Sequence, residues 1–305
     1  MNLYSPLTGL DDITLLKTIE VNQLIDEWNH SFNIDITSEL QGYNEINLYQ
    51  CNQTKLRFFF PFDIAGSDKL YEQLEKFDWY YMPRKWEHDV AIKDLEECSE
   101  ILEVGCGRGA FVERLRKEIG ANVQGLEFNK NAIIYAQNAG ISVTDQDVHQ
   151  LANNSPCSFD GICTFQVLEH IPEVYVFLKS LIELLKPSGK LVISVPNNLS
   201  FTKYCKNDLL DQPPHHMTQW NIEVFQFLTQ IFPIEIKSYS YEPLAEYHID
   251  WYLSIQSTRL PKIALLTRLL NKGLYTFAKP LLKRHSFFRE LITGHTIYVC
   301  FQKSL

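Results

Sequence analysis

The sequence predicts an α/β protein built on an open, Rossmann-like sheet with helices on both of its faces. Between residues 99 and 244, short apolar segments of strand length alternate with segments of helical spacing, a pattern typical of right-handed β-α-β crossovers. A glycine-rich turn at residues 105–109 separates the first strand of this region from its first helix. Two further strand-like segments, 234–241 and 295–301, would complete the sheet.

The strands of this sheet are assigned from apolar runs bounded by polar or turn residues. The first helix is expected at Ala110–Glu118. The helix before the fifth strand should end near Pro187 and Gly189, because neither residue favours a continued helix. The expected strands are Ile101–Val104, Asn122–Leu126, Ile141–Val143, Gly161–Phe165 and Lys190–Val195.

The chain divides into two parts that differ in their pattern of apolar and polar residues. Residues 1–98 are polar and irregular, with β-like patches at Ile46–Tyr49 and Leu56–Phe62 and a helix expected at Asp68–Phe77. Residues 1–76 of this region are expected to form a small N-terminal module. Residues 77–305 are expected to form the main domain, which carries a helical insertion at 245–294 between its last two strands. An insertion of that length is more typical of a functional element than of a loop.

Composition and charge exclude several classes of protein. The 305 residues are 45% hydrophobic and 21% charged, as in folded globular chains. The net charge of −9 argues against a nucleic-acid partner, which requires a basic face. The seven cysteines follow no C-x-x-C spacing, so the reducing cytoplasm is the expected location. We expect neither a signal peptide nor a membrane-spanning helix.

The glycine-rich turn indicates a nucleotide-type cofactor. Glycines at 105, 107 and 109 let the backbone turn sharply and approach a ligand, and the next helix offers free N–H groups. Glu127 ends the second strand, where the ribose-binding carboxylate of such sheets lies. Gly105, Gly107 and Ala110 also satisfy a dinucleotide fingerprint, so this motif alone leaves the cofactor open.

Six motifs follow one another through the predicted sheet. They are Ile101–Gly109, Gly125–Glu127, Asp147–Leu151, Phe159–Ile162, Val167–His170 and Leu185–Lys190. In this order they resemble the motifs of class I S-adenosylmethionine-dependent methyltransferases of the ubiquinone-methyltransferase-like group. The resemblance implies a sheet with an antiparallel last strand, S-adenosylmethionine as the cofactor, and methyl transfer as the reaction.

The resemblance also implies which residues hold the cofactor. Glu127 would accept both ribose hydroxyls, and Asp147 would accept the adenine amino group, since carboxylates suit both donors. Any of these positions could instead be a loop residue without a ligand. The residues expected at the cofactor are Glu103, Gly105, Gly107, Glu127, Asp147, Val148, Phe165 and Gln166.

We expect no metal ion in the segment that follows the fourth strand. The segment resembles a site of ubiquinone O-methyltransferases at which two glutamates and a histidine hold magnesium. Gln166 stands where the first of those glutamates would be, and losing an anionic ligand weakens such a site. Glu169 and His170 are therefore expected to brace the turn before Pro172.

The N-terminal module resembles a zinc ribbon that has lost its ligands. Ser5–Thr8 and Cys51–Thr54 look like its two halves, but hydroxyls replace three of the four thiolates. Neutral hydroxyls do not substitute for thiolates on zinc, so no metal is expected here either. Further along the chain, the aromatic segment formed by Trp79, Tyr80, Tyr81 and Trp86 would either close over the cofactor or pack the module onto the sheet.

The loop after the fifth strand carries the candidate acceptor-binding residues. Pro213, Pro214, His215 and His216 lie near the carboxyl edge of the sheet, where substrates of open α/β sheets bind. The run resembles a segment common in methyltransferases from surface-polysaccharide gene clusters. A neutral histidine can accept the proton of an acceptor hydroxyl, which makes His215 and His216 candidate catalytic bases. Alternatively, both histidines pin the loop by hydrogen bonds.

The insertion is strongly basic. Residues 259–289 contain eight Lys and Arg residues and no Asp or Glu, and apolar residues recur there at helical spacing. Such a helix could contact an anionic membrane from the inner face. A lid or a dimer-forming pair of helices is the alternative, and the oligomeric state is open.

These observations favour an S-adenosylmethionine-dependent methyltransferase that methylates an oxygen of a small-molecule, glycan or lipid-linked acceptor. The alternatives are an NAD-dependent oxidoreductase or epimerase and a non-catalytic cofactor-binding scaffold. A dinucleotide site would need a second mononucleotide-binding half, which the sequence does not show.

Overall fold

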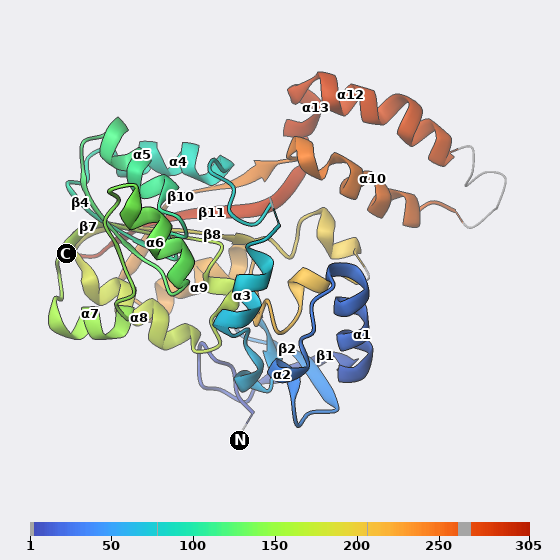
Figure 1. The fold of residues 1–305 in the computed structure, drawn as a ribbon, viewed down its shortest axis with the longest axis horizontal. Helices are drawn as coiled ribbons and strands as arrows, with labels where there is room; N and C mark the ends of the chain where they lie inside the picture. The colour runs from blue at the N-terminus through green and yellow to red at the C-terminus, as the bar shows by residue number, and fades with distance from the viewer. Residues whose placement is uncertain (1–2, 78, 206, 262–269) are drawn as a thin grey trace.

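The computed structural model describes residues 3–77, 79–205, 207–261 and 270–305, and its main feature is a seven-stranded sheet (Figure 1). All neighbouring strands are parallel except the two pairs that β11 makes with β8 and β10. The predicted fold class, with its antiparallel last strand, is confirmed. From edge to edge the strands are β10 (Ile234–Pro243), β11 (Thr293–Lys303), β8 (Leu185–Pro196), β7 (Phe159–Phe165), β4 (Glu100–Val104), β5 (Asn122–Leu126) and β6 (Val143–Thr144).

Helices cover both faces of this sheet because successive side chains of a strand point to opposite sides. On β4, Ile101 packs with the layer of α4, α5 and α6, whereas Leu102 packs with the layer of α7, α8 and α9. The carboxyl ends of the parallel strands are left open for a site. The helices are α4 (Trp86–Leu95), α5 (Ala110–Glu118), α6 (Lys130–Asn138), α7 (Val148–Asn154), α8 (Val174–Leu184) and α9 (Ile222–Ile231).

The N-terminal module is built around a second, antiparallel sheet in the order β1-β2-β3-β9. Its last strand, β9, belongs to the histidine-bearing loop of the main domain, so the two parts share one sheet. The division after residue 76 stays a prediction. The elements are β1 (Ile13–Glu20), α1 (Val21–Phe32), α2 (Thr37–Leu40), β2 (Glu45–Cys51), β3 (Arg57–Phe60), α3 (Asp68–Leu74) and β9 (Thr218–Gln219).

The insertion projects away from the sheet (Figure 1). It contains α10 (Ile249–Thr258), a π-helical turn at Leu274–Ala278, α12 (Lys279–Arg284) and α13 (Ser286–Glu290). Buried residues of α10 and α12 form a small apolar cluster at its base. The part of the predicted amphipathic helix at 262–269 lies outside the described residues.

The remaining global features concern cysteines and membrane helices. All seven cysteines are free thiols, and five of them are buried. None of the helices in the described ranges combines the length and the apolar character needed to cross a bilayer.

Candidate functional site

The glycine loop connects β4 to α5 at the carboxyl edge of the sheet. Gly105 and Gly107 have φ angles of +76° and +54°, in the left-handed region that favours glycine. A Cβ atom on Gly105 would lie 2.2 Å from Val167 Cγ2, and one on Gly107 would lie 2.9 Å from the ring of Tyr81. The loop therefore has no room for side chains at these two positions.

The carboxylate of Glu127, which follows β5, fixes this loop. Its Oε2 accepts the N–H of Gly107 at 2.8 Å, and its Oε1 accepts the N–H groups of Phe128 and Asn129 at 2.8 and 2.9 Å. A carboxylate offers about four acceptor positions, so three backbone donors leave capacity on Oε2. The side chain is thus held in place while one of its oxygens can take a further donor.

Glu103 is a buried carboxyl group on β4 that also lines the cavity beside the glycine loop. Its Oε2 has no hydrogen-bond partner among the described residues. Burial raises the pKa of Glu103 to about 8, and the charge of Lys85 offsets part of that rise. An unpaired buried oxygen of this kind fits a ligand that brings a positively charged donor.

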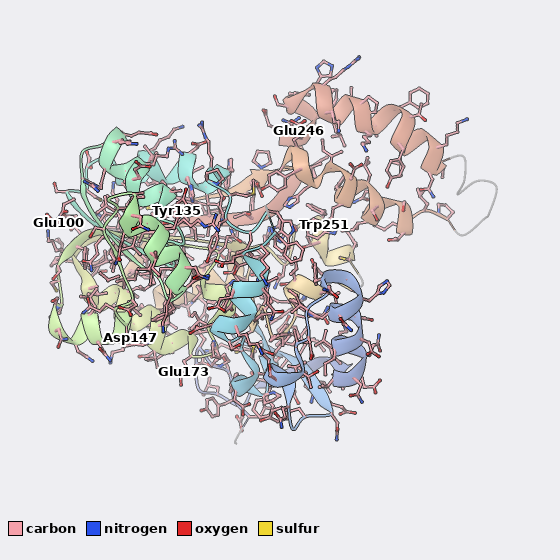
Figure 2. The ribbon with its side chains drawn as sticks, in the orientation of Figure 1. Glu100, Tyr135, Asp147, Glu173, Glu246 and Trp251 are labelled. Carbon is pink, nitrogen blue, oxygen red and sulfur yellow. The ribbon has the colours of Figure 1, made fainter. Side chains whose placement is uncertain are left out.

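The structure places Asp147 at the N-cap of α7 (Figure 2). Its Oδ1 accepts the N–H groups of His149 and Gln150, each at 2.9 Å. The adjacent Gln146 and Val148 line the cavity, whereas Asp147 is not among its described lining residues. Helix capping is therefore the observed role of Asp147, and its contact with adenine stays a prediction.

Phe165 and Gln166 lie where β7 ends, and both line the cavity. The Phe165 ring packs against the rings of Phe111 and His88, with centroids 5.1 Å apart in each case. The Gln166 Nε2 donates to Glu87 Oε1 at 3.2 Å. Glu87 and His88 are buried on α4, and the sequence did not predict them as site residues. The one feature of the sequence that could have indicated them is a pair of polar residues on the helix face that packs inward.

His215 and His216 are both about 6% exposed, on a loop that is anchored by the pairing of β9 with β3. His215 Nδ1 lies 2.8 Å from the carbonyl oxygen of Leu210, and His216 Nδ1 lies 3.2 Å from Asp211 Oδ1. The Leu210 carbonyl oxygen only accepts, so His215 Nδ1 carries the proton and His215 Nε2 keeps its lone pair. An ionised Asp211 would fix His216 in the same tautomer, but burial raises the pKa of Asp211 well above its usual value. His215 Nε2 is buried and has no partner in the described chain.

The two imidazoles are neutral at pH 7. Burial, with a smaller effect of His170, lowers the pKa of His215 to about 3. Burial also lowers the pKa of His216 well below its usual value. A neutral ring with a free lone pair is the form that accepts a proton or binds a metal ion.

His170 joins these two histidines. Its Nδ1 donates to the carbonyl oxygen of His215, and its ring centroid lies 4.7 Å from that of His215 and 4.8 Å from that of His216. His170 thus braces the histidine loop, whereas the expected role was to brace the turn before Pro172. Both carboxylate oxygens of Glu169 are buried without a partner from another described residue, so its side chain does not brace that turn by a hydrogen bond.

The aromatic segment borders both parts of the site. Tyr81 covers the glycine loop and lies 5.3 Å from the guanidinium of Arg108. The Tyr80 ring centroid lies 6.3 Å from that of His215. The segment therefore packs the N-terminal module onto the sheet and also walls the cavity.

A single cavity of about 1400 Å³ joins these features. It is lined by the glycine loop, Glu127, the three histidines and the aromatic segment. Trp251, near the start of α10 (Figure 2), and His295 on β11 add the base of the insertion to its wall. The glycine loop and the histidine loop therefore border one shared space.

Comparison with known proteins places this cavity in a family context. The methyltransferase domain family matches residues 78–240. The "Ubiquinone biosynthesis O-methyltransferase" of Xanthomonas euvesicatoria is 34% identical over 105 residues, which cover 32% of this chain and 44% of that protein. The protein of the same name from Idiomarina loihiensis is 32% identical over 104 residues, covering 32% and 42%. The similarity thus spans less than half of these curated relatives.

One similar solved structure is a SAM dependent methyltransferase from Archaeoglobus fulgidus. The two chains superpose with a TM-score of 0.48 and 21% sequence identity. The superposition covers 78% of this chain and 95% of the other.

Proposed function

Because the chain belongs to the methyltransferase domain family, we propose that it transfers a methyl group from S-adenosylmethionine to an oxygen atom of an acceptor. The observation that carries this proposal is the one cavity that both the glycine loop and the histidine loop line. Transfer between two molecules requires them to meet in alignment in a shared space. An NAD-dependent enzyme is not favoured, because β11 runs antiparallel where a second nucleotide-binding half would continue the parallel sheet.

The cofactor is proposed to lie along the carboxyl ends of β4 and β5. Glu127 would accept the ribose hydroxyls at Oε2, and Glu103 would accept the ammonium group of the methionine part. Asp147 would accept the adenine amino group beside Val148. The full set of proposed cofactor residues is Glu103, Gly105, Gly107, Glu127, Asp147, Val148, Phe165 and Gln166.

The acceptor is proposed to meet the cofactor at the histidine loop. S-adenosylmethionine supplies an already activated sulfonium methyl group, so the chain needs to align and desolvate the reactants. His215 and His216 are the proposed catalytic residues: their Nε2 atoms would accept the acceptor's hydroxyl proton as the methyl group moves to oxygen. The acceptor class is a hydroxyl-bearing small molecule, with a glycan or lipid-linked sugar included.

The insertion is proposed to contact an anionic membrane surface at its cytoplasmic face. Phe277, Phe287 and Leu291 are largely exposed, and the exposed Lys283 and Arg284 lie in the same helical segment. Apolar side chains beside cations match the headgroup and acyl boundary of such a surface. A lipid-linked acceptor would then be presented to the cavity whose wall the insertion forms.

We expect the purified protein to sediment with vesicles that contain anionic lipid and not with neutral vesicles. Each basic residue near an anionic surface contributes about 1 kcal/mol, and salt screens this attraction. Replacing both Phe277 and Phe287 with serine should reduce binding several-fold, whereas Leu15→Ser, an exposed apolar position on β1, should leave it unchanged. Equal binding to neutral vesicles would contradict the electrostatic part.

The N-terminal module is proposed to be a ribbon-like fold without zinc. Ser5, Cys51 and Thr54 are buried close to the β2–β3 turn. The Ser5 hydroxyl accepts the N–H of Thr8 at 3.4 Å, and the Thr54 hydroxyl accepts the N–H of Leu56 at 3.1 Å. Hydroxyl groups thus make local hydrogen bonds where thiolates would hold a metal.

Calorimetric titration tests the cofactor assignment. We expect S-adenosylhomocysteine to bind with one-to-one stoichiometry and NAD to give no heat of binding. The product is the better probe because it keeps the ribose, adenine and methionine groups that the cavity recognises. Binding of NAD without binding of S-adenosylhomocysteine would overturn the proposed function.

The pH dependence of the same titration reports on Glu103. Burial raises the pKa of its carboxyl group to about 8, so this group is mostly protonated at pH 6 and increasingly ionised toward pH 8. A cationic ligand binds the ionised form better, so affinity should rise from pH 6 to pH 8 with release of protons. Glu103→Gln removes the ionisable group and should flatten this dependence.

A further inference from the structure

Three histidine side chains from two distant segments meet in the cavity wall. One comes from the short 3-10 turn Leu168–His170 after β7, and two come from the loop before β9. One ring nitrogen from each of His170, His215 and His216 lies within 4.8 Å of one from each of the others. No sequence motif joins them, since His170 and His215 are separated by 45 positions.

The hydrogen bonds of the rings decide where their lone pairs lie. Each Nδ1 faces an oxygen: the His215 carbonyl for His170, the Leu210 carbonyl for His215, and Asp211 Oδ1 for His216. A carbonyl oxygen accepts only, and the Asp211 carboxylate also accepts from Gln219 through its other oxygen. The Nδ1 atoms of His170 and His215 therefore donate, and their Nε2 atoms keep a lone pair. His216 has the same tautomer when Asp211 is ionised, a form that the burial of Asp211 disfavours by raising its pKa.

This pattern is how proteins prepare histidines for metal binding. A ligating histidine usually donates its other ring N–H to a carbonyl or carboxylate, which fixes the tautomer and the ring orientation. Without a ligand the arrangement is costly, because His215 Nε2 is buried and has no described partner. The carboxylate of Glu169, which lines the same cavity, is likewise buried with both oxygens unpaired by other described residues. A cation would satisfy these buried hydrogen-bond acceptors, which have no donor among the described residues.

We propose that His170, His215 and His216 bind one divalent transition-metal ion, with zinc the first candidate, and leave a coordination position open to the cavity. Imidazole nitrogens suit zinc and its neighbours better than magnesium, which prefers oxygen. Zn–N bonds of about 2.1 Å place nitrogens of a tetrahedral site about 3.4 Å apart, so the rings must approach by roughly 1 Å on binding. This proposal departs from the expectation, drawn from the sequence, that the segment after the fourth strand holds no metal ion.

The ion would also change how the acceptor is activated, a consequence that rests on the proposed function. An ion held by these histidines would supply Lewis-acid chemistry: it would make an acceptor hydroxyl more acidic, so that the proton passes to solvent while the oxygen takes the methyl group and the electron pair of the S–CH₃ bond stays on sulfur. His215 and His216 would then act as ligands of the ion and not as bases.

Metal titration of the chelator-treated, full-length protein tests this site without any acceptor. We expect one equivalent of zinc to bind, measured by competition with a chromophoric chelator and by elemental analysis. His170→Ala and His216→Ala should each weaken zinc binding by on the order of 10²-fold or more. His30→Ala, an exposed histidine of α1, and Cys51→Ser, in the ribbon-like module, should leave it unchanged.

Cobalt and S-adenosylhomocysteine keep the test interpretable. Cobalt bound in place of zinc should give the visible absorption of a nitrogen-rich, low-coordinate site, which is lost in the histidine variants. Each variant must still bind S-adenosylhomocysteine, which shows that it is folded and separates this proposal from the proposed function. Absence of tight zinc binding by the wild-type protein, or zinc binding that survives in the histidine variants, would overturn the site.

Discussion

Glu127→Ala is expected to weaken binding of S-adenosylhomocysteine by on the order of 10²–10⁴-fold. Each ribose hydroxyl bonded to a carboxylate contributes about 1.5–3 kcal/mol, and two such bonds would be lost. The substitution also removes the acceptor for the N–H groups of Gly107, Phe128 and Asn129, so the glycine loop loses its support. Calorimetry on the purified variant measures the change directly.

One further variant of Glu127 distinguishes the effect of its charge from that of its shape, and a variant of a second glutamate serves as a control. Glu127→Gln keeps an acceptor oxygen at the same place, so its loss of affinity should be clearly smaller than that of alanine. Glu118→Ala removes a carboxylate of α5 that pairs with Arg114, away from the cavity lining, and should leave the affinity unchanged. If Glu127→Ala binds S-adenosylhomocysteine like the wild type, Glu127 has no place in the cofactor site.

The parallel sheet could be predicted because its elements carry local signals. Strand β5 (Asn122–Leu126) and helix α5 (Ala110–Glu118) have the bounds that the sequence predicted. Gly109 and Gly120 flank α5, and apolar runs mark what is buried on both sides. The helix before the fifth strand was expected to end near Pro187 and Gly189, but α8 ends at Leu184 and both residues lie in β8 (Leu185–Pro196). The edge strand β6 was expected at Ile141–Val143 and is found at Val143–Thr144, because a short edge strand has few apolar positions to define its bounds.

The N-terminal module could be predicted only in part. The β-like patches at Ile46–Tyr49 and Leu56–Phe62 and the helix expected at Asp68–Phe77 coincide with β2, β3 and α3, whereas β1 and α1 were not expected. Strand β1 (Ile13–Glu20) has a single buried residue, so its sequence shows no alternation of apolar and polar positions. Helix α1 (Val21–Phe32) buries only Val21, Leu24 and Trp28 in a polar segment. Packing within the module stabilises both elements, and the sequence did not predict either of them.

The residues of the candidate site likewise fall into those that the sequence predicted and those that it did not. The glycine loop and Glu127 were found because their spacing along the chain carries the signal. Neighbours that meet only after folding were not found: Val167 beneath Gly105, His88 against Phe165, and His170 beside the two loop histidines. Residues from separate segments become a site only once strand order is known, and a single sequence does not state that order.

Gly105→Ala is expected to lower both the affinity for S-adenosylhomocysteine and the thermal stability. The new Cβ atom would lie 2.2 Å from Val167 Cγ2, whereas carbon atoms in contact are about 3.5–4.0 Å apart, so the loop must move by more than 1 Å. A shift of that size in a binding loop costs on the order of 10²-fold. Calorimetry and thermal unfolding measure the two effects separately.

A matched glycine and a second substitution isolate the steric cause. Gly120→Ala has the same kind of backbone, with φ +70°, but no atom lies within 4 Å of its new Cβ, so it should cost only about 1 kcal/mol of stability and no affinity. Val167→Ala removes the clashing methyl group, so the double variant with Gly105→Ala should regain much of the lost affinity. Equal losses in the Gly105→Ala and Gly120→Ala variants, or no recovery in the double variant, would show that backbone strain and not contact with Val167 requires glycine at position 105.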